Sequence, residues 1–190
     1  LPMILGRELF DAARLRIDID GRRIGEVDRD STPPGVALDL TEEHGVTTLP
    51  VIVEGGEPVR ATFDLGNGAQ VLVSQAFAVR RGFFADGREV SHESGGGLGG
   101  AADRAVIVLR SLDLAGHRFE NVEAAVDPQD TASDVNIGVS LLRSFILTTD
   151  FSRHRVWLLE RKGRKAGQGI RRAPNRDAGS PARASPPRAQ

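Results

Sequence analysis

The sequence predicts a mainly β fold, a small barrel-like lobe with one or two short helices. The composition favours this class because 22 glycines and an aromatic content of 5% are typical of short strands joined by many turns. Apolar and polar residues alternate along several segments between residues 47 and 160, as they do in half-buried strands. An internal repeat then indicates how these segments are organised within a chain of 190 residues, which has room for one ordinary domain with an appendage.

The internal repeat aligns the residues from Ile4 with those from Asn136, without gaps and at a constant offset of 132 positions. Each copy contains apolar residues and a glycine, a short helix, a strand that ends on Asp, a turn and another strand. The matched pairs include Gly6 with Gly138, Leu9 with Leu141, Leu15 with Leu147, Asp18 with Asp150, Arg23 with Arg155 and Ile24 with Val156. The first 27 residues therefore resemble the end of one unit, and residues 47–160 form the whole of the next.

The second unit contains dense strand signals. Residues 48–64 predict a hairpin around Gly55 and Gly56, and 70–74 predict a third strand. A short helix should follow, capped at Ser74. The later elements are a long hairpin over 104–126 that turns at Ala115 and Gly116, a helix after 136–138, and two closing strands at 146–151 and 155–159.

Two polar stretches flank this unit. Residues 28–46 contain Pro33, Pro34 and Gly35 and are interpreted as a linker. Residues 161–190 hold nine Lys/Arg, one acid and almost no large apolar residues, which predicts a disordered basic tail. Because no aromatic residues are interleaved with these charges, nucleic acid is not an expected partner. Four segments are therefore expected: 1–27, the truncated end of a preceding unit; 28–46, a linker; 47–160, a complete lobe; and 161–190, a tail.

Several classes of chemistry are excluded or disfavoured. The chain has no Cys, which excludes disulfides and thiol nucleophiles, and its four His show no paired ligand spacing, so neither a metal nor a cofactor is expected. The glycine-rich segment 94–100 formally contains G-x-G-x-x-G. It lacks the preceding strand and following helix that a dinucleotide loop needs.

No apolar run reaches the roughly 18 residues that a transmembrane helix requires.

The segment TFDLGNG places Asp64 at the end of a strand, before a glycine turn. Taken alone, this pattern is a common turn. The order of elements around it, however, resembles one lobe of the retropepsin-like and pepsin-like aspartic protease family, specifically bacterial members with two lobes in tandem. The resemblance covers 47–160 in full and 1–27 as the end of a preceding lobe. It implies a closed β-barrel lobe of the acid-protease type, and it suggests a periplasmic or secreted protein, although the sequence itself leaves the compartment unknown.

The family motif is an apolar residue, Asp, Thr or Ser, and Gly. Phe63, Asp64 and Gly66 match it, so the resemblance assigns the catalytic carboxylate to Asp64. Gly66 allows the backbone to turn beneath the carboxyl group. Leu65 departs from the family pattern because it has no hydroxyl to form a hydrogen bond between the two catalytic loops. Asn67 could supply an amide to the same network.

A second glycine landmark of the family packs beside the catalytic loop. Ile137 and Gly138 match it, whereas Asn136 stands where an apolar residue is expected. The first copy matches this landmark better, through Ile4, Leu5 and Gly6. The glycine-rich segment corresponds to the family's flap, a hairpin that closes over the substrate. Its alternative interpretation is a flexible loop. The flap residues expected to bind substrate are Gly95, Gly96, Gly97, Leu98 and Gly99.

The resemblance implies an aspartic endopeptidase that acts on a peptide or protein substrate. Its mechanism needs two carboxylates, and this chain offers one at Asp64. The second would come from the preceding lobe or from the mate in a homodimer. The alternative is a catalytically inactive protease-like β domain that binds a peptide or a partner protein, with Asp64 as a relic.

Overall fold

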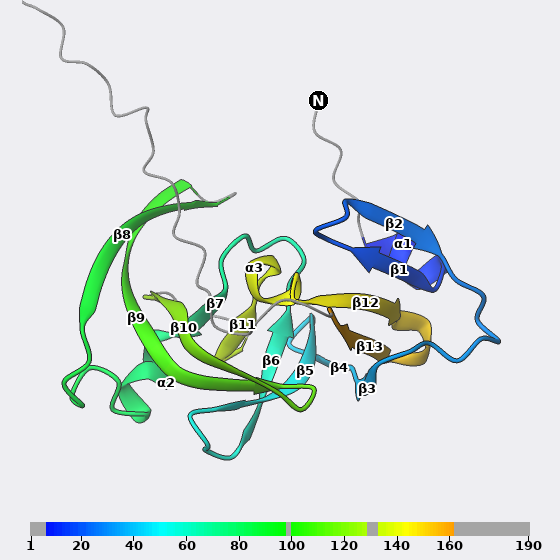
Figure 1. Ribbon diagram of the computed structural model, residues 1–190. Coiled ribbons are helices and arrows are strands. Elements are labelled where there is room, and N and C mark those ends of the chain that lie inside the picture. Colours follow the sequence, from blue (N-terminus) through cyan, green and yellow to red (C-terminus); the bar gives the residue numbers. More distant parts are fainter. Residues whose placement is uncertain (1–6, 98–99, 129–132, 162–190) are drawn as a thin grey trace, which may run out of the picture.

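The computed structural model describes residues 7–97, 100–128 and 133–161, and it confirms the mainly β architecture (Figure 1). In chain order the elements are α1 (Arg7–Ala12), β1 (Leu15–Asp18), β2 (Arg23–Glu26), β3 (Val36–Asp39), β4 (Thr41–Glu43), β5 (Val46–Val53), β6 (Pro58–Phe63), β7 (Val71–Ser74), α2 (Gln75–Arg80), β8 (Val90–Gly97), β9 (Gly100–Leu114), β10 (His117–Asp127), β11 (Val135–Ile137), α3 (Val139–Leu142), β12 (Phe145–Asp150), η1 (Phe151–Arg153) and β13 (Arg155–Glu160).

The larger sheet has eight strands in the order β4-β5-β6-β11-β7-β10-β9-β8. A further pairing joins β9 back to β5 through Ile52 with Asp113 and Val53 with Leu112, so six of the strands form a ring of paired neighbours. Apolar side chains from this ring and from β12 and β13 share one buried core. Its largest fully buried members include Phe83, Phe145, Leu49, Ile107, Leu109, Leu112, Leu114, Ile137, Leu142, Leu147 and Leu158.

The local elements expected within 47–160 are confirmed. β5 and β6 form the first hairpin, and β9 and β10 form the long one around Ala115, which has a φ of 53°. α2 begins after Ser74, whose hydroxyl oxygen accepts a hydrogen bond of 3.0 Å from the Phe77 N–H. This N-cap satisfies one of the four N–H groups that a helix start leaves without a partner.

The position of β11 decides where the candidate site forms. β11 lies between β6 and β7, parallel to β6 and antiparallel to β7. Ile137 thereby pairs with Phe63 on one side and with Val71 on the other. Because these two partners flank the loop that contains Asp64, β11 brings the segment after Ile137 against that loop.

The smaller sheet has five strands in the order β2-β1-β12-β13-β3, and it contains both copies of the repeat. β1 and β12 pair antiparallel, with Leu15 opposite Thr149 and Ile17 opposite Leu147. The central pair, Arg16 and Thr148, joins positions that are equivalent at the offset of 132. The two copies are therefore related by a local two-fold axis through this pair.

The turn that follows the first strand has a residue with the same backbone conformation in both copies. Arg22 and His154, again 132 positions apart, have φ angles of 52° and 51°, values that residues other than Gly rarely adopt. The burial of equivalent apolar residues, however, differs sharply between the two copies. Leu9 is 37% exposed where its counterpart Leu141 is 3% exposed, and Ile24 is 47% exposed where Val156 is fully buried.

Residues 28–46, interpreted from the sequence as a linker, contain two short strands. β3 pairs with β13, and β4 pairs with β5. Leu40, between them, is buried in the shared core. The segment therefore contributes an edge strand to each sheet, in addition to connecting the first copy of the repeat to the lobe.

A buried ion pair joins the first copy to the second. The Arg14 guanidinium donates to Asp150 at 3.0 Å, with the two side chains 3% and 0% exposed. Arg14 also donates to the carbonyl oxygens of Asp28 and Ser31, and it lies 5.1 Å from the Trp157 ring centre. Burial raises the pKa of the Asp150 carboxyl, but hydrogen bonds from the Ser152 hydroxyl and Arg14 outweigh it, so this pKa lies below its usual value.

Arg14→Met is expected to lower the free energy of unfolding by about 3–5 kcal/mol, because it leaves a buried carboxylate without its partner. Urea denaturation at neutral pH measures this loss. The double variant Arg14→Met with Asp150→Leu should recover most of it, because it removes both charges together. A loss of less than about 1 kcal/mol in the single variant would contradict this role for the pair.

The pH dependence follows from the lowered pKa of Asp150. A carboxyl whose pKa is lower in the folded state stabilises the fold above the unfolded pKa, here near 3.8. That stabilisation disappears as the pH falls through the folded pKa. Arg14→Met should therefore flatten the acid side of the stability profile, and an unchanged acid side would contradict the assignment.

Candidate active site

Asp64 lies directly after β6, at the start of the glycine turn predicted from the sequence. Its backbone N–H donates to the Ile137 carbonyl oxygen at 3.1 Å, which extends the β6–β11 pairing by one residue. The side chain is half-buried and borders a pocket of about 370 Å³. Asp64 is thus one of the residues that line this pocket, and its catalytic role stays a prediction.

The loop after Asp64 is held by backbone hydrogen bonds to the residues after β11. The Gly138 N–H donates to the Gln70 carbonyl at 2.9 Å, and the Val139 N–H donates to the Asn67 carbonyl at 2.7 Å. This set of contacts between 67–70 and 138–140 is called the loop clasp below. It requires glycine at 138, because a Cβ there would lie 2.2 Å from the Ala69 carbonyl oxygen. Ile137 and Gly138 therefore lie beside the candidate catalytic loop, as the sequence predicted.

The Asp64 carboxylate is engaged at both oxygens. Oδ1 accepts a hydrogen bond of 2.8 Å from the Gly66 N–H, the turn expected beneath the carboxyl group. Oδ2 accepts one of 2.9 Å from Nδ2 of Asn136. Asn67 joins the same network by donating from Nδ2 to Oδ1 of Asn136, also at 2.9 Å. The sequence predicts that Asn67 supplies an amide near the catalytic loop. The hydrogen bond from Asn136 to Asp64 has no such sequence signal, because Asn136 stands where the family pattern has an apolar residue.

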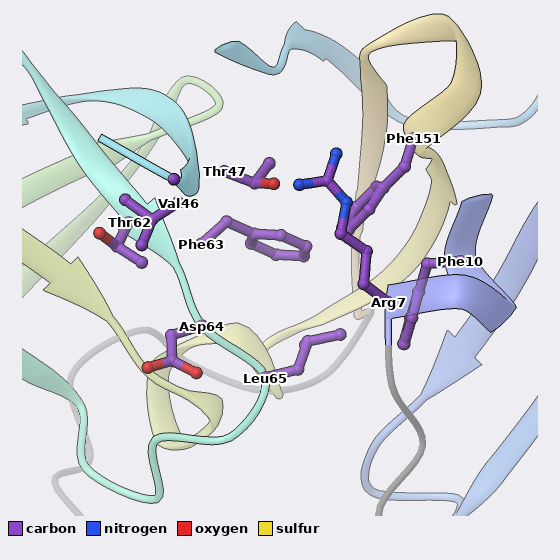
Figure 2. A pocket seen from close by; sticks show the side chains of 10 residues that line it. Arg7, Phe10, Val46, Thr47, Thr62, Phe63, Asp64, Leu65 and Phe151 are labelled. Atoms are coloured by element: carbon purple, nitrogen blue, oxygen red, sulfur yellow. The ribbon is translucent and has the colours of Figure 1, made fainter. Parts of the chain in front are cut away.

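Leu65 takes part in apolar contacts. Figure 2 shows the Asp64 carboxylate pointing away from the Phe63 ring, whereas the Leu65 side chain extends toward Phe10 and Arg7. An aromatic series links this wall to the first copy of the repeat. The Phe151 ring centre lies 6.3 Å from that of Phe63 and 5.4 Å from that of Phe10. The contributions of Phe10 and Phe151 to the site were missed at the sequence level, because no local motif marks them.

The charge at the opposite side of the pocket comes from Arg7. Its guanidinium forms ion pairs with Glu42 and, at 3.3 Å, with Asp11. Both partners and Arg7 itself are largely exposed, so these pairs contribute little to stability. Among the residues that line this pocket, all of them within the described part of the chain, Asp64 supplies the one carboxylate.

The expected flap coincides with the hairpin of β8 and β9, which Figure 1 shows as a long curved arm. Gly95, Gly96 and Gly97 belong to β8 and pair with Ala102, Ala101 and Gly100 of β9. Leu98 and Gly99 lie outside the described residues, as do Ile4, Leu5 and Gly6 of the first copy. The hairpin form is therefore present, and substrate binding by its glycines remains a prediction.

Comparisons with known proteins agree with this geometry. Residues 49–141 match a family model described as aspartyl protease. Among solved structures, a retropepsin-like aspartic protease from Rickettsia conorii matches with a TM-score of 0.50 and 18% sequence identity, over 67% of this chain and 96% of that chain. A search of curated proteins finds no match. The resemblance inferred from the sequence is confirmed, because the aspartyl protease family model matches residues 49–141 and the structural match shows a retropepsin-like fold.

Gly138→Ala is expected to displace the 67–70 loop, because its Cβ would meet backbone oxygens at 2.2 and 2.7 Å. The free energy of unfolding should fall by about 1–3 kcal/mol, the usual cost of overpacking, as measured by urea denaturation. Gly68→Ala is the matched control in the same loop, since nothing lies within 4 Å of a Cβ there. Equal losses in the two variants would be evidence against the loop clasp.

Proposed function

We propose that this chain supplies one catalytic lobe of an aspartic endopeptidase, with Asp64 as one of two carboxylates that activate a water molecule. The family match and the retropepsin-like fold support an aspartic protease-type function. The observation that carries the proposal for Asp64 itself is the loop clasp. It fixes the loop that follows Asp64, a half-buried residue that lines the pocket, through backbone hydrogen bonds from Gly138 and Val139.

The proposed reaction divides two tasks between two carboxyl groups. One carboxylate takes a proton from the water as the water oxygen attacks the peptide carbonyl carbon, and the other carboxyl, protonated, gives its proton to the carbonyl oxygen, which forms a gem-diol. The C–N bond then breaks as the first carboxyl returns its proton to the leaving nitrogen and the second takes a proton back from the gem-diol. Two acids about 3 Å apart share one proton and titrate as a pair. Asp64 alone cannot perform both tasks in the same step, so the site needs a second acid.

The second acid would come from another lobe placed across the local two-fold axis. The two copies of the repeat pair through β1 and β12, and apolar residues of the first copy are exposed where their counterparts are buried. A second lobe that covers Leu9 and Ile24 would make the burial of both copies alike. This lobe could belong to a longer form of the chain or to a homodimer mate.

The substrate of this proposal is an extended peptide that lies beneath the β8–β9 hairpin. Extended peptides bind through main-chain hydrogen bonds to strand edges, and glycines at a hairpin end allow close approach of the two backbones. Gly95, Gly96 and Gly97 belong to β8, which supports this part of the proposal. Among the described residues, no helix is long and apolar enough to cross a membrane.

A second candidate function is supported by Leu65. A lobe without the usual hydroxyl beside its aspartate could bind peptide without cleaving it, and the Leu65 side chain here packs against the core. The two candidates differ in one measurable property. Both bind an extended peptide, but only the enzyme releases two products from it.

Asp64→Asn in the full-length protein is expected to abolish pepstatin-sensitive cleavage of a peptide library, because an amide cannot accept the proton of the attacking water. Cleavage is measured by mass spectrometry from acidic to neutral pH. Asp113→Asn serves as the control, a carboxylate on β9 that pairs with the exposed Arg118. Retained cleavage by Asp64→Asn would remove Asp64 from the mechanism, and peptide binding without cleavage by the wild type would favour the second candidate.

A further inference from the structure

Two asparagine side chains form a continuous series of hydrogen bonds that ends on the Asp64 carboxylate. The Ala69 N–H donates to Oδ1 of Asn67, Nδ2 of Asn67 donates to Oδ1 of Asn136, and Nδ2 of Asn136 donates to Oδ2 of Asp64. All three distances are 2.9 Å. We call this series the amide relay. It connects residues that are up to 72 positions apart in the sequence.

The direction of the amide relay is determined at both of its ends. A backbone N–H can only donate, so the oxygen of Asn67 must face Ala69 and its NH₂ group must face Asn136. The oxygen of Asn136 then accepts that bond, which leaves its NH₂ group for Asp64. An ionised carboxylate can only accept, so the same orientation is required from the other end. Neither amide can flip without losing a hydrogen bond.

The backbone around Asn136 gives the relay a rigid base. Asn136 is the central residue of β11 and pairs with Thr62 of β6 on one side and Leu72 of β7 on the other. Its Cα is therefore held between two strands, and the loop clasp holds Asn67 through the bond from the Val139 N–H. A donor fixed in this way restricts rotation of the carboxyl group that accepts from it.

We propose that Asn136, oriented by Asn67, is a positioning residue for Asp64, which it holds from within the lobe, where Leu65 has no hydroxyl to offer a second catalytic loop. This inference rests on the proposed function. Each carboxylate oxygen has two acceptor sites. Gly66 uses one on Oδ1 and Asn136 uses one on Oδ2, so both oxygens keep an acceptor site for the water and for the second acid. The lobe thus orients its own aspartate from within, and Leu65 is free to make apolar contacts.

Asn136→Leu tests the proposal in the full-length protein, because Leu has a similar size and is the apolar type that the family pattern expects there. The kcat for peptide cleavage should fall by about 10- to 100-fold, the usual effect of losing a group that orients a catalytic side chain, while KM changes less than about twofold. Asp113→Asn is the control for activity, because Asp113 lies on β9, outside the loop clasp and the amide relay. Ser140→Ala removes a hydrogen bond of 2.6 Å to the Gly68 carbonyl within the loop clasp, and it is a control for the NMR measurement alone.

A second readout does not depend on cleavage. The side-chain NH₂ resonances of Asn136 in a ¹H–¹⁵N NMR spectrum, identified by their loss in Asn136→Leu, should shift in Asp64→Ala and in Asn67→Ala, and should remain in place in Ser140→Ala. Unshifted resonances in Asp64→Ala would overturn the relay itself. A kcat for Asn136→Leu within twofold of the wild type would overturn the positioning role. If the wild type does not cleave, the proposed function and the positioning role both fail, and the NMR shifts still decide whether the hydrogen bonds exist.

Discussion

The loop clasp is the constraint on which the rest of this site depends. Backbone N–H groups of Gly138 and Val139 bond to carbonyls of the loop that follows Asp64, and this contact exists because β11 enters the sheet between β6 and β7. These backbone hydrogen bonds join residues 67–70 to 138–140, and they restrict the movement of both segments. The glycine at 138 follows from the same contact, since any Cβ would occupy the position of a carbonyl oxygen.

The two copies of the repeat differ in how far their equivalent apolar residues are buried. In the second copy, Leu141 and Val156 are buried by the strands of the lobe, whereas Leu9 and Ile24 of the first copy lack an equivalent cover among the described residues. The ion pair between Arg14 and Asp150 and the aromatic series through Phe151 hold the two copies together. The five-stranded sheet thus joins the two copies, and the proposed function assigns the second acid to a further lobe beside the first copy.

Much of the fold could be predicted from the sequence because its signals are local. Glycine turns, strand alternation and the Ser74 cap depend on neighbouring residues, and the constant offset of 132 revealed the repeat. The place of Ile137 and Gly138 beside the loop that follows Asp64 was predicted from the family resemblance. The bond from Asn136 to Asp64 could not be predicted, because it depends on strand order and on side-chain rotamers. The strands β3 and β4 were also missed, since Pro33 and Pro34 dominate the pattern of a segment whose strands are three and four residues long.

The central claim is that Asp64 faces a second acid across the local two-fold axis. A crystal structure of the full-length protein with a bound peptide inhibitor tests it most directly, through the distance from the Asp64 carboxyl oxygens to the nearest carboxyl oxygen of a second lobe, whether that lobe belongs to the same chain or to a homodimer mate. The account predicts a distance of about 3 Å, with the inhibitor lying over both groups. An Asp64 side chain that faces solvent, with no second carboxyl group near it, would contradict the account.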